Sequence, residues 1–260
     1  MKRKFDFAIR FLLILFLFSA CSGTNNSNKL EYKAHYAVDS LWDQASQSDT
    51  AFQHVIANYK VQLDDQMNKV LGICDKDMIA RKPESDLSNF VADAMLEIGK
   101  TYCEENHLSH SVDIAVMNQG GIRTALAKGK ITTGRIFEML PFKNKLVIVS
   151  MDGKQLKGLL DQIASFGGEG IGGMKMGMKE KKAVEISIDG KPLQEDHIYY
   201  VISIDYLVNG GGGLTAFANR KTFRHLHQKL RNEIITYLLH KQEIGEHITA
   251  KLDGRLYHVE

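Results

Sequence analysis

The sequence lacks several of the patterns by which common hydrolases are recognised. It contains no Gly-x-Ser-x-Gly segment, which argues against a serine hydrolase. Candidate metal ligands are also few. His107 and His110 have no carboxylate at a suitable spacing apart from Asp113, and His225 and His227 come just before an expected helix. We therefore expect no metal ion or other cofactor in this chain, and we assign no catalytic residue to it.

Only one unbroken apolar run stands out near the start, and at residues 11–18 it is too short to span a bilayer. Four basic residues precede it, and small residues followed by Cys21 end it, an arrangement that resembles a bacterial lipobox. We predict that residues 1–20 are a lipoprotein signal peptide and that Cys21 is lipidated. The protein would then lie in a bacterial cell envelope, anchored to a membrane at the periplasmic or outer-membrane surface. The alternative is an ordinary cleaved signal peptide with an incidental cysteine.

The net charge of the chain is small, and it has few cysteines. The whole chain has a formal net charge of +2, and removal of residues 1–20, with four basic residues and one acidic, leaves −1. No basic tail indicates a nucleic-acid partner. Beyond Cys21 only Cys74 and Cys103 remain, and the sequence leaves open whether they pair.

Composition and periodicity divide the chain into a leader, a tether and one domain. Residues 21–50 are rich in Ser, Asn, Gln and Asp and read as a tether with an irregular segment, whereas residues 51–260 suit a single domain without repeats. Apolar spacing predicts helices at 52–70, with a buried stripe, at 87–98 after a cap at Ser85 or Asp86, at 134–140, at 155–164, and in a final helix carrying Leu226 to Leu239. Strands are predicted at 114–117, 146–151, 184–188 and 199–204. This mixture without a strict βαβ rhythm favours an α+β fold.

Two glycine-rich stretches are less regular. The glycines of 167–170 are followed by no lysine and Ser/Thr pair, so we reject a phosphate-binding P-loop there. Residues 166–178 read instead as a mobile loop near the site or a poorly packed hairpin. The other stretch, Asn118-Gln119-Gly120-Gly121-Ile122-Arg123, closes a buried strand. There a ligand can approach glycines that carry no Cβ, and Arg123 is suited to phosphate or carboxylate. A hairpin corner with a surface arginine is the alternative.

Four ordered blocks carry a resemblance to a known family: 81–95, 118–123, 138–144 and 203–213. Together they resemble the C-terminal, substrate-binding domain of the 5'-nucleotidase family, the group of periplasmic UDP-sugar hydrolases and ecto-5'-nucleotidases. The likeness runs from about Phe52 to near the C-terminus. It implies a layered α/β/β/α arrangement within the α+β class.

The resemblance also implies a nucleotide-binding site. The base of the nucleotide would stack between Phe142 and Tyr206, and the phosphate or ribose would bind to arginines. The substrate-binding residues implied are Arg81, Asn118, Gly121, Arg123, Phe142, Asn144 and Tyr206. One departure is that Gly212 occupies the place where relatives carry an aspartate for the ribose hydroxyls. A second arginine found in some members has no counterpart, and Asp77 lies near its position.

Family enzymes also hold two metal ions in a separate domain, on Asp, His and Asn clusters. This chain has no Asp-x-His and no Gly-Asn-His-Asp block. The sequence therefore predicts the nucleotide-binding half of a split 5'-nucleotidase, inactive alone, with divalent metals supplied by a separately encoded metallophosphatase chain. The alternatives are a non-catalytic surface lipoprotein that captures an AMP-like or UDP-sugar-like ligand, and a scaffold with a decayed site.

Overall fold

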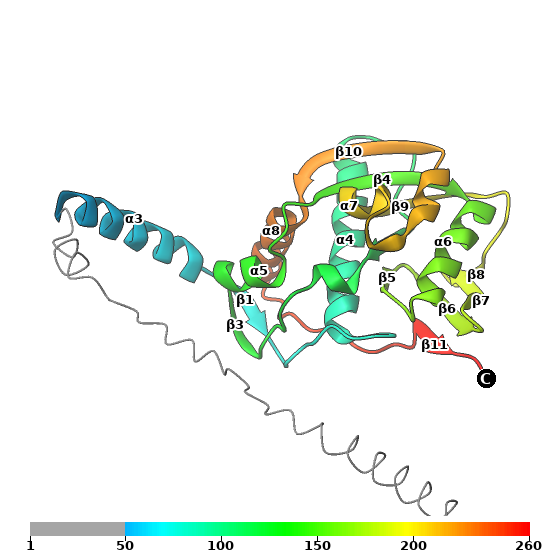
Figure 1. Cartoon of the computed structure of the whole chain (residues 1–260), viewed down its shortest axis with the longest axis horizontal. Helices are drawn as coiled ribbons and strands as arrows, with labels where there is room; N and C mark the ends of the chain where they lie inside the picture. The colour runs from blue at the N-terminus through cyan, green and yellow to red at the C-terminus, as the bar shows by residue number, and fades with distance from the viewer. Residues whose placement is uncertain (1–49) are drawn as a thin grey trace, which may run out of the picture. The chain divides into compact units, whose positions relative to one another are not determined.

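The computed structural model of the protein describes residues 50–260 (Figure 1). The predicted signal peptide, the lipidated Cys21 and most of the predicted tether lie outside the described residues. The helices are α3 (Thr50–Asn68), α4 (Asp86–Glu105), α5 (Thr133–Met139), α6 (Gly153–Ser165), α7 (Asp205–Val208) and α8 (Leu230–Glu243). The strands are β1 (Val70–Cys74), β2 (Ile114–Met117), β3 (Gly129–Thr132), β4 (Lys145–Asp152), β5 (Gly170–Gly172), β6 (Met174–Lys179), β7 (Lys182–Ile188), β8 (Lys191–Pro192), β9 (Ile198–Ile204), β10 (Thr222–Lys229) and β11 (Leu256–His258).

A five-stranded mixed sheet, in the order β10-β4-β9-β2-β5, forms the centre. Strands β2 and β9 run parallel, and the other neighbours are antiparallel. Every residue of β2 is buried, as are all residues of β4 except its two ends. Since alternate side chains of a strand point to opposite faces, both faces of this sheet must be covered.

Helices supply that cover and connect the central sheet to two smaller ones. Helix α4 packs on β2, β5 and β9, and α8 packs on α4, β1 and β10. Helix α6 contacts β4 and β9, and also β7 of a second sheet ordered β11-β6-β7-β8 (Figure 1). Strands β1 and β3 form a separate antiparallel pair. The predicted α+β class is confirmed.

The predicted helix after Pro83 is confirmed together with its cap. Ser85 is the N-cap of α4, and its side-chain oxygen accepts from the backbone N–H of Ser88. This hydroxyl satisfies one of the donors that a helix start leaves free. Helix α6 begins in the same way, with reciprocal hydrogen bonds between Asp152 and Gln155. Leu156, Leu159 and Leu160 of this helix are fully buried.

The predicted burial of the stripe on α3 is wrong. Ile56, Tyr59 and Leu63 are 50%, 72% and 44% exposed among the described residues. The first backbone hydrogen bond to the rest of the domain forms just after the helix, where the backbone N–H of Thr133 donates to the carbonyl of Lys69. Periodicity identifies the helix and its apolar face, but it carries no information about what covers that face.

The interpretation of residues 166–178 as a mobile loop or loose hairpin is also wrong, because they form β5 and β6 with mostly buried residues. The glycines allow α4 and β2 to approach closely. A Cβ on Gly172 would lie 3.0 Å from the carbonyl oxygen of Ala92, and one on Gly173 would lie 2.1 Å from that of Asp113. Side chains at these positions would separate α4 from the sheet edge.

The last helix starts later than predicted. Leu226, His225 and His227 lie on strand β10, and α8 begins at Leu230. The register of β10 against β4 shifts between His225 and Lys229, and His227 has φ +62°. Leu226 and Leu230 are four residues apart, as on one face of a helix, but Leu226 belongs to the strand and Leu230 to the helix. The spacing alone therefore predicted a helix that starts too early.

Both cysteines of the domain are free and buried. Burial raises the pKa of the Cys74 thiol, and it does the same for the pKa of Cys103. Among the helices of residues 50–260, none combines the length and apolar character needed to cross a membrane.

Candidate functional site

The Gly-Gly turn lies where strand β2 ends, and it joins the first two sequence blocks. It forms a short 3-10 helix, η1 (Gln119–Gly121). The side-chain amide of Gln119 donates to the carbonyl of Arg81 at 2.6 Å. Arg123 Nη1 donates to the carbonyl of Gly120 at 3.1 Å, and both arginine side chains are exposed. Arg81 and Arg123 therefore flank the same turn.

Glycine is needed at this turn for close approach and not for an unusual backbone angle. A Cβ on Gly121 would lie 2.5 Å from Met117 Cε and 3.0 Å from Asn118 Oδ1. Neither turn glycine has a positive φ. Asn118 Oδ1 is buried and has no hydrogen-bond partner among the described residues. An unpaired buried acceptor of this kind is unusual in a folded protein.

The third block reaches the turn through the loop after α5. The backbone N–H of Arg123 donates to the carbonyl of Met139, the last residue of α5. The ring of Phe142 is 49% exposed. Phe142 and Asn144 line a small cavity that Gly121 also borders. The predicted residues Gly121, Phe142 and Asn144 are thus brought together.

The fourth block joins the same area through Asp205. Its Oδ1 accepts from the backbone N–H of Lys145, which follows the Phe142 loop, and from that of Tyr206. The Tyr206 ring is 49% exposed, and its Oη accepts from the backbone N–H of Gly212 at 3.1 Å. Gly212 belongs to the 3-10 helix η2 (Gly211–Gly213) and has φ +63°. The glycine run therefore folds back under the Tyr206 ring.

Two further residues adjoin these blocks, and sequence reasoning missed both. Glu169 is 8% exposed; its Oε2 accepts from the backbone N–H of Gln119 at 2.6 Å, and its Oε1 lies 3.1 Å from Lys82 Nζ. The Phe166 ring lies 2.9 Å from where a Cβ on Gly213 would be. The signal available in the sequence was an acidic residue inside a glycine-rich segment, and a test for a P-loop does not detect it.

Arg231 was missed as well, because an arginine in the first turn of a helix reads as a surface residue. Its guanidinium is buried and lies over the Phe137 ring, with Cζ 3.8 Å from the ring centre. Burial lowers the pKa of Arg231. Arg81, Arg123 and Arg231 therefore come from three blocks or elements that meet near the turn, whereas the charge of Lys82 is paired with Glu169. Phe142 and Tyr206 are both about half exposed, and exposed rings of this kind can stack on a flat ligand.

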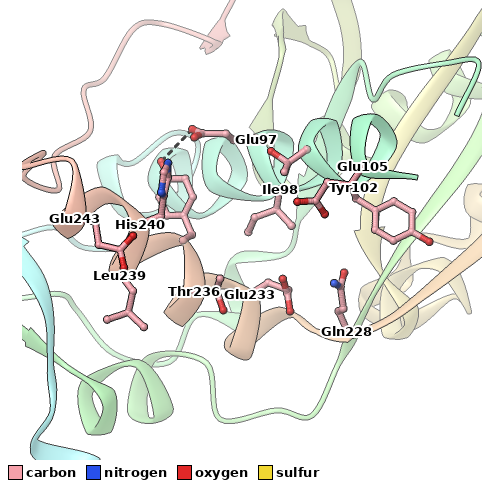
Figure 2. Close-up of a pocket in the computed structure, with 12 residues that line it drawn as sticks. Glu97, Ile98, Tyr102, Glu105, Gln228, Glu233, Thr236, Leu239, His240 and Glu243 are labelled. Carbon is pink, nitrogen blue, oxygen red and sulfur yellow. Dashed lines mark hydrogen bonds between the residues drawn. The ribbon is translucent and has the colours of Figure 1, made fainter. Parts of the chain in front are cut away.

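A pocket of about 690 Å³ between α4 and α8 has the opposite character (Figure 2). Its lining includes Glu97 and Glu105 from α4 and Glu233 and Glu243 from α8. Burial, followed by the charge of Glu105, raises the pKa of Glu233. Burial and the charge of Glu97 also raise the pKa of Tyr237 to about 12. These carboxylates would repel a phosphate, so this pocket does not suit a nucleotide.

Within residues 50–260, no three His, Cys, Asp or Glu side chains are grouped so that they could hold a metal ion. His225 and His227, the pair with the closest spacing in sequence, have ring centres 5.5 Å apart and lie on strand β10. The residues that the sequence predicted for the site are arginines, asparagines, aromatic residues and a glycine.

Comparison with known proteins identifies the fold and the family. A profile described as 5'-nucleotidase, C-terminal domain, matches residues 55–219, well over half of the chain. The trifunctional nucleotide phosphoesterase protein YfkN of Bacillus subtilis is 26% identical over 238 residues, covering 84% of this chain and 16% of that protein. The cell wall protein Lmo0130 of Listeria monocytogenes is 29% identical over 228 residues, covering 77% of this chain and 28% of that protein.

Solved structures agree on the fold. The 5'-nucleotidase precursor from Thermus thermophilus matches with a TM-score of 0.67 and 23% identity, covering 82% of this chain and 44% of that one. The NAD nucleotidase of Haemophilus influenzae matches with a TM-score of 0.62 and 20% identity, covering 82% and 42%. This chain thus spans less than half the length of each of these relatives. By the extent of the profile match, the chain belongs to the 5'-nucleotidase C-terminal domain family.

Proposed function

We propose that this chain is the nucleotide-binding half of a split 5'-nucleotidase, and that a separate metallophosphatase chain supplies the catalytic metals. The observation that carries the proposal is the meeting of four distant sequence blocks around one Gly-Gly turn. Hydrogen bonds link Gln119 to Arg81 and Arg123 to Gly120, and a shared cavity links Gly121 to Phe142.

Each part of a nucleotide has a matching group in this arrangement. The base would stack between Phe142 and Tyr206, whose half-exposed faces can contribute about 1–3 kcal/mol per stacked base. Asn118 and Asn144 would hydrogen-bond polar edges. Arg81 and Arg123 would bind the phosphate or the ribose side through charge-assisted hydrogen bonds.

The chemistry would come from the partner chain. Two-metal hydrolysis uses metal ions to activate a water molecule and to stabilise both oxygens of the displacement. The sequence has no Asp-x-His or Gly-Asn-His-Asp block to hold such ions. This chain would bind and orient the nucleotide and would be inactive alone. Lipidation at Cys21 would keep it at a membrane surface of the cell envelope, where the partner would also be found.

The test is reconstitution. The purified mature chain is mixed with a metallophosphatase lipoprotein from the same cell envelope, and metal-dependent phosphate release from AMP is measured. We expect release to exceed that of the partner alone, and to return to the partner's level when this chain carries Phe142→Ala and Tyr206→Ala together. Tyr59→Ala, which removes a ring 72% exposed on α3, is the aromatic control. No gain over the partner alone would contradict the proposal.

A second candidate function is capture of nucleotides or nucleosides by a non-catalytic surface lipoprotein. It is favoured by one observation: all the candidate ligand groups come from this single chain. Calorimetric titration with AMP, adenosine and UDP-glucose separates the two. Tight binding by the isolated chain favours capture, whereas weak binding that a metallophosphatase strengthens favours the split enzyme.

A further inference from the structure

One buried cation near the site has no counter-charge in the described part of the chain. Arg231, in the first turn of α8, is 9% exposed, and none of the ion pairs within residues 50–260 involves it. A guanidinium keeps its charge in proteins even when burial lowers its pKa. A buried charge without a carboxylate is disfavoured unless its N–H groups find acceptors.

Some of those acceptors are on the loop that carries Phe142. Arg231 Nη1 donates to the carbonyl of Pro141 at 3.2 Å and lies 3.4 Å from that of Leu140. The Phe137 ring covers the guanidinium face. The Nε–H group is different: it is buried and has no hydrogen-bond partner among the described residues. Arg231 therefore holds the Phe142 loop and still has a donor to spare.

The spare donor belongs to a side chain that lines the small cavity of the candidate site. Phe142, Asn144 and Gly121 line the same cavity, and the backbone N–H of Leu230 donates to the carbonyl of Asn144. The cavity measures about 10 Å³, room for one oxygen-sized atom. A cavity of this size, beside an exposed ring and an unpartnered charged donor, fits one acceptor atom of a ligand stacked on that ring.

We propose that Arg231 and this cavity form an acceptor subsite that takes a carbonyl oxygen of the base, so that oxo-bases are bound in preference to amino-bases. The inference rests on the proposed stacking of a base on Phe142. Uracil and hypoxanthine present a carbonyl oxygen where cytosine and adenine present an amino group. An amino group would bring a second donor against Arg231 and leave both unpaired. Stacking alone tolerates every base, and this subsite adds the discrimination that stacking lacks.

Two pairs of nucleotides exchange a carbonyl for an amino group at that position. UMP and CMP differ at C4 and also at N3, which carries a hydrogen only in UMP, and IMP and AMP differ in the same way at C6 and N1, so the Arg231 variant is needed to assign any preference to the subsite. Dissociation constants of the full mature chain are measured for all four by calorimetry and by NMR shift titration, which detects millimolar binding. We expect UMP to bind about tenfold more tightly than CMP, and IMP than AMP, as one hydrogen bond to a base edge provides.

The variant that tests the subsite is Arg231→Met, which keeps side-chain bulk but removes the donors. We expect it to bring both affinity ratios close to one. Arg220→Met is the matched control, since Arg220 also donates to two backbone carbonyls, of Val208 and Phe217, and lies over a ring, Phe223. It should leave both ratios unchanged. Circular dichroism and a thermal melt check that each variant is folded.

Several outcomes would overturn the proposal. If the wild-type chain binds all four nucleotides equally, the subsite does not exist and the proposed nucleotide-binding function stands. If Arg231→Met weakens all four by the same factor and keeps the ratios, Arg231 only holds the Phe142 loop. If Arg231→Met does not fold, equal affinities of the wild-type chain for the four nucleotides would still overturn the proposal. If no nucleotide binds at all, the proposed function fails and this inference fails with it.

Discussion

The surroundings of the Gly-Gly turn and the pocket between α4 and α8 differ in the charged side chains that they present. Around the Gly-Gly turn lie Arg81, Arg123 and Lys82, whereas the pocket is lined by Glu97, Glu105, Glu233 and Glu243 (Figure 2). The pocket is wide, at about 690 Å³, and the site cavity is tiny. Volume alone would therefore favour the acidic pocket for a nucleotide. We propose instead that the nucleotide binds beside the Gly-Gly turn, because of the arginines and the exposed rings of Phe142 and Tyr206.

The largest effect should come from removing a cation at the Gly-Gly site. Arg123→Ala should weaken AMP binding by about 1.5–3 kcal/mol, since charged hydrogen bonds contribute that much. Glu243→Ala, in the acidic pocket, is the control and should leave the dissociation constant unchanged. Calorimetric titration measures both. An unchanged constant for Arg123→Ala would remove that residue from the site, and a large effect of Glu243→Ala would favour the acidic pocket as the nucleotide site.

A smaller effect on AMP binding should follow from introducing, at Gly212, the aspartate that relatives carry at this position. Gly212 has φ +63°, a backbone conformation that aspartate and asparagine tolerate better than most residues. Its added Cβ would lie 3.2 Å from Leu207 Cδ2. Gly212→Asp should tighten AMP binding by about 0.5–1.5 kcal/mol through a hydrogen bond to a ribose hydroxyl.

The comparison with deoxy-AMP makes that result specific. Binding of deoxy-AMP to Gly212→Asp should improve less, because one ribose hydroxyl is missing. Gly212→Asn tests the backbone strain without adding the negative charge. Equal gains for AMP and deoxy-AMP would show that the new carboxylate does not read the ribose.

Much of this fold could be predicted from local patterns. The strand ending at Met117 and the helix capped by Ser85 depend on neighbours in sequence, and both were found. The burial of α3 could not be predicted, because it depends on what covers Ile56 and Tyr59. Residues 166–178 were misread because glycines serve flexible loops and close packing alike, and only the contact with α4 decides between them.

The candidate site divides in the same way. The blocks with Arg123, Phe142 and Tyr206 were recognisable as motifs, because their residues adjoin glycines or prolines in a fixed order. Glu169 and Arg231 were not recognisable. Their roles depend on contacts 50 and about 90 residues away in sequence, with Gln119 and with the carbonyls of Leu140 and Pro141. Such contacts exist only after the chain has folded.

The smallest effect concerns the acidic pocket, and it depends on pH. Glu233 has a folded-state pKa raised by burial and by Glu105, so its ionisation opposes folding. Glu233 therefore contributes most to the free energy of unfolding at pH values below its unfolded-state pKa. This contribution is lost as the pH rises through the folded-state pKa.

Glu233→Gln removes this pH-dependent loss of stability, because glutamine does not ionise. At pH 7.5 we expect its unfolding midpoint to lie about 1–2 °C above wild type, as about 0.5 kcal/mol implies for a domain of this size. At pH 4 the two midpoints should coincide, because wild-type Glu233 is then largely protonated. Glu243→Gln, on the same pocket, is the control. An equal gain at both pH values would mean that packing and not charge is responsible, and the acidic character assigned to the pocket would then have no effect on stability.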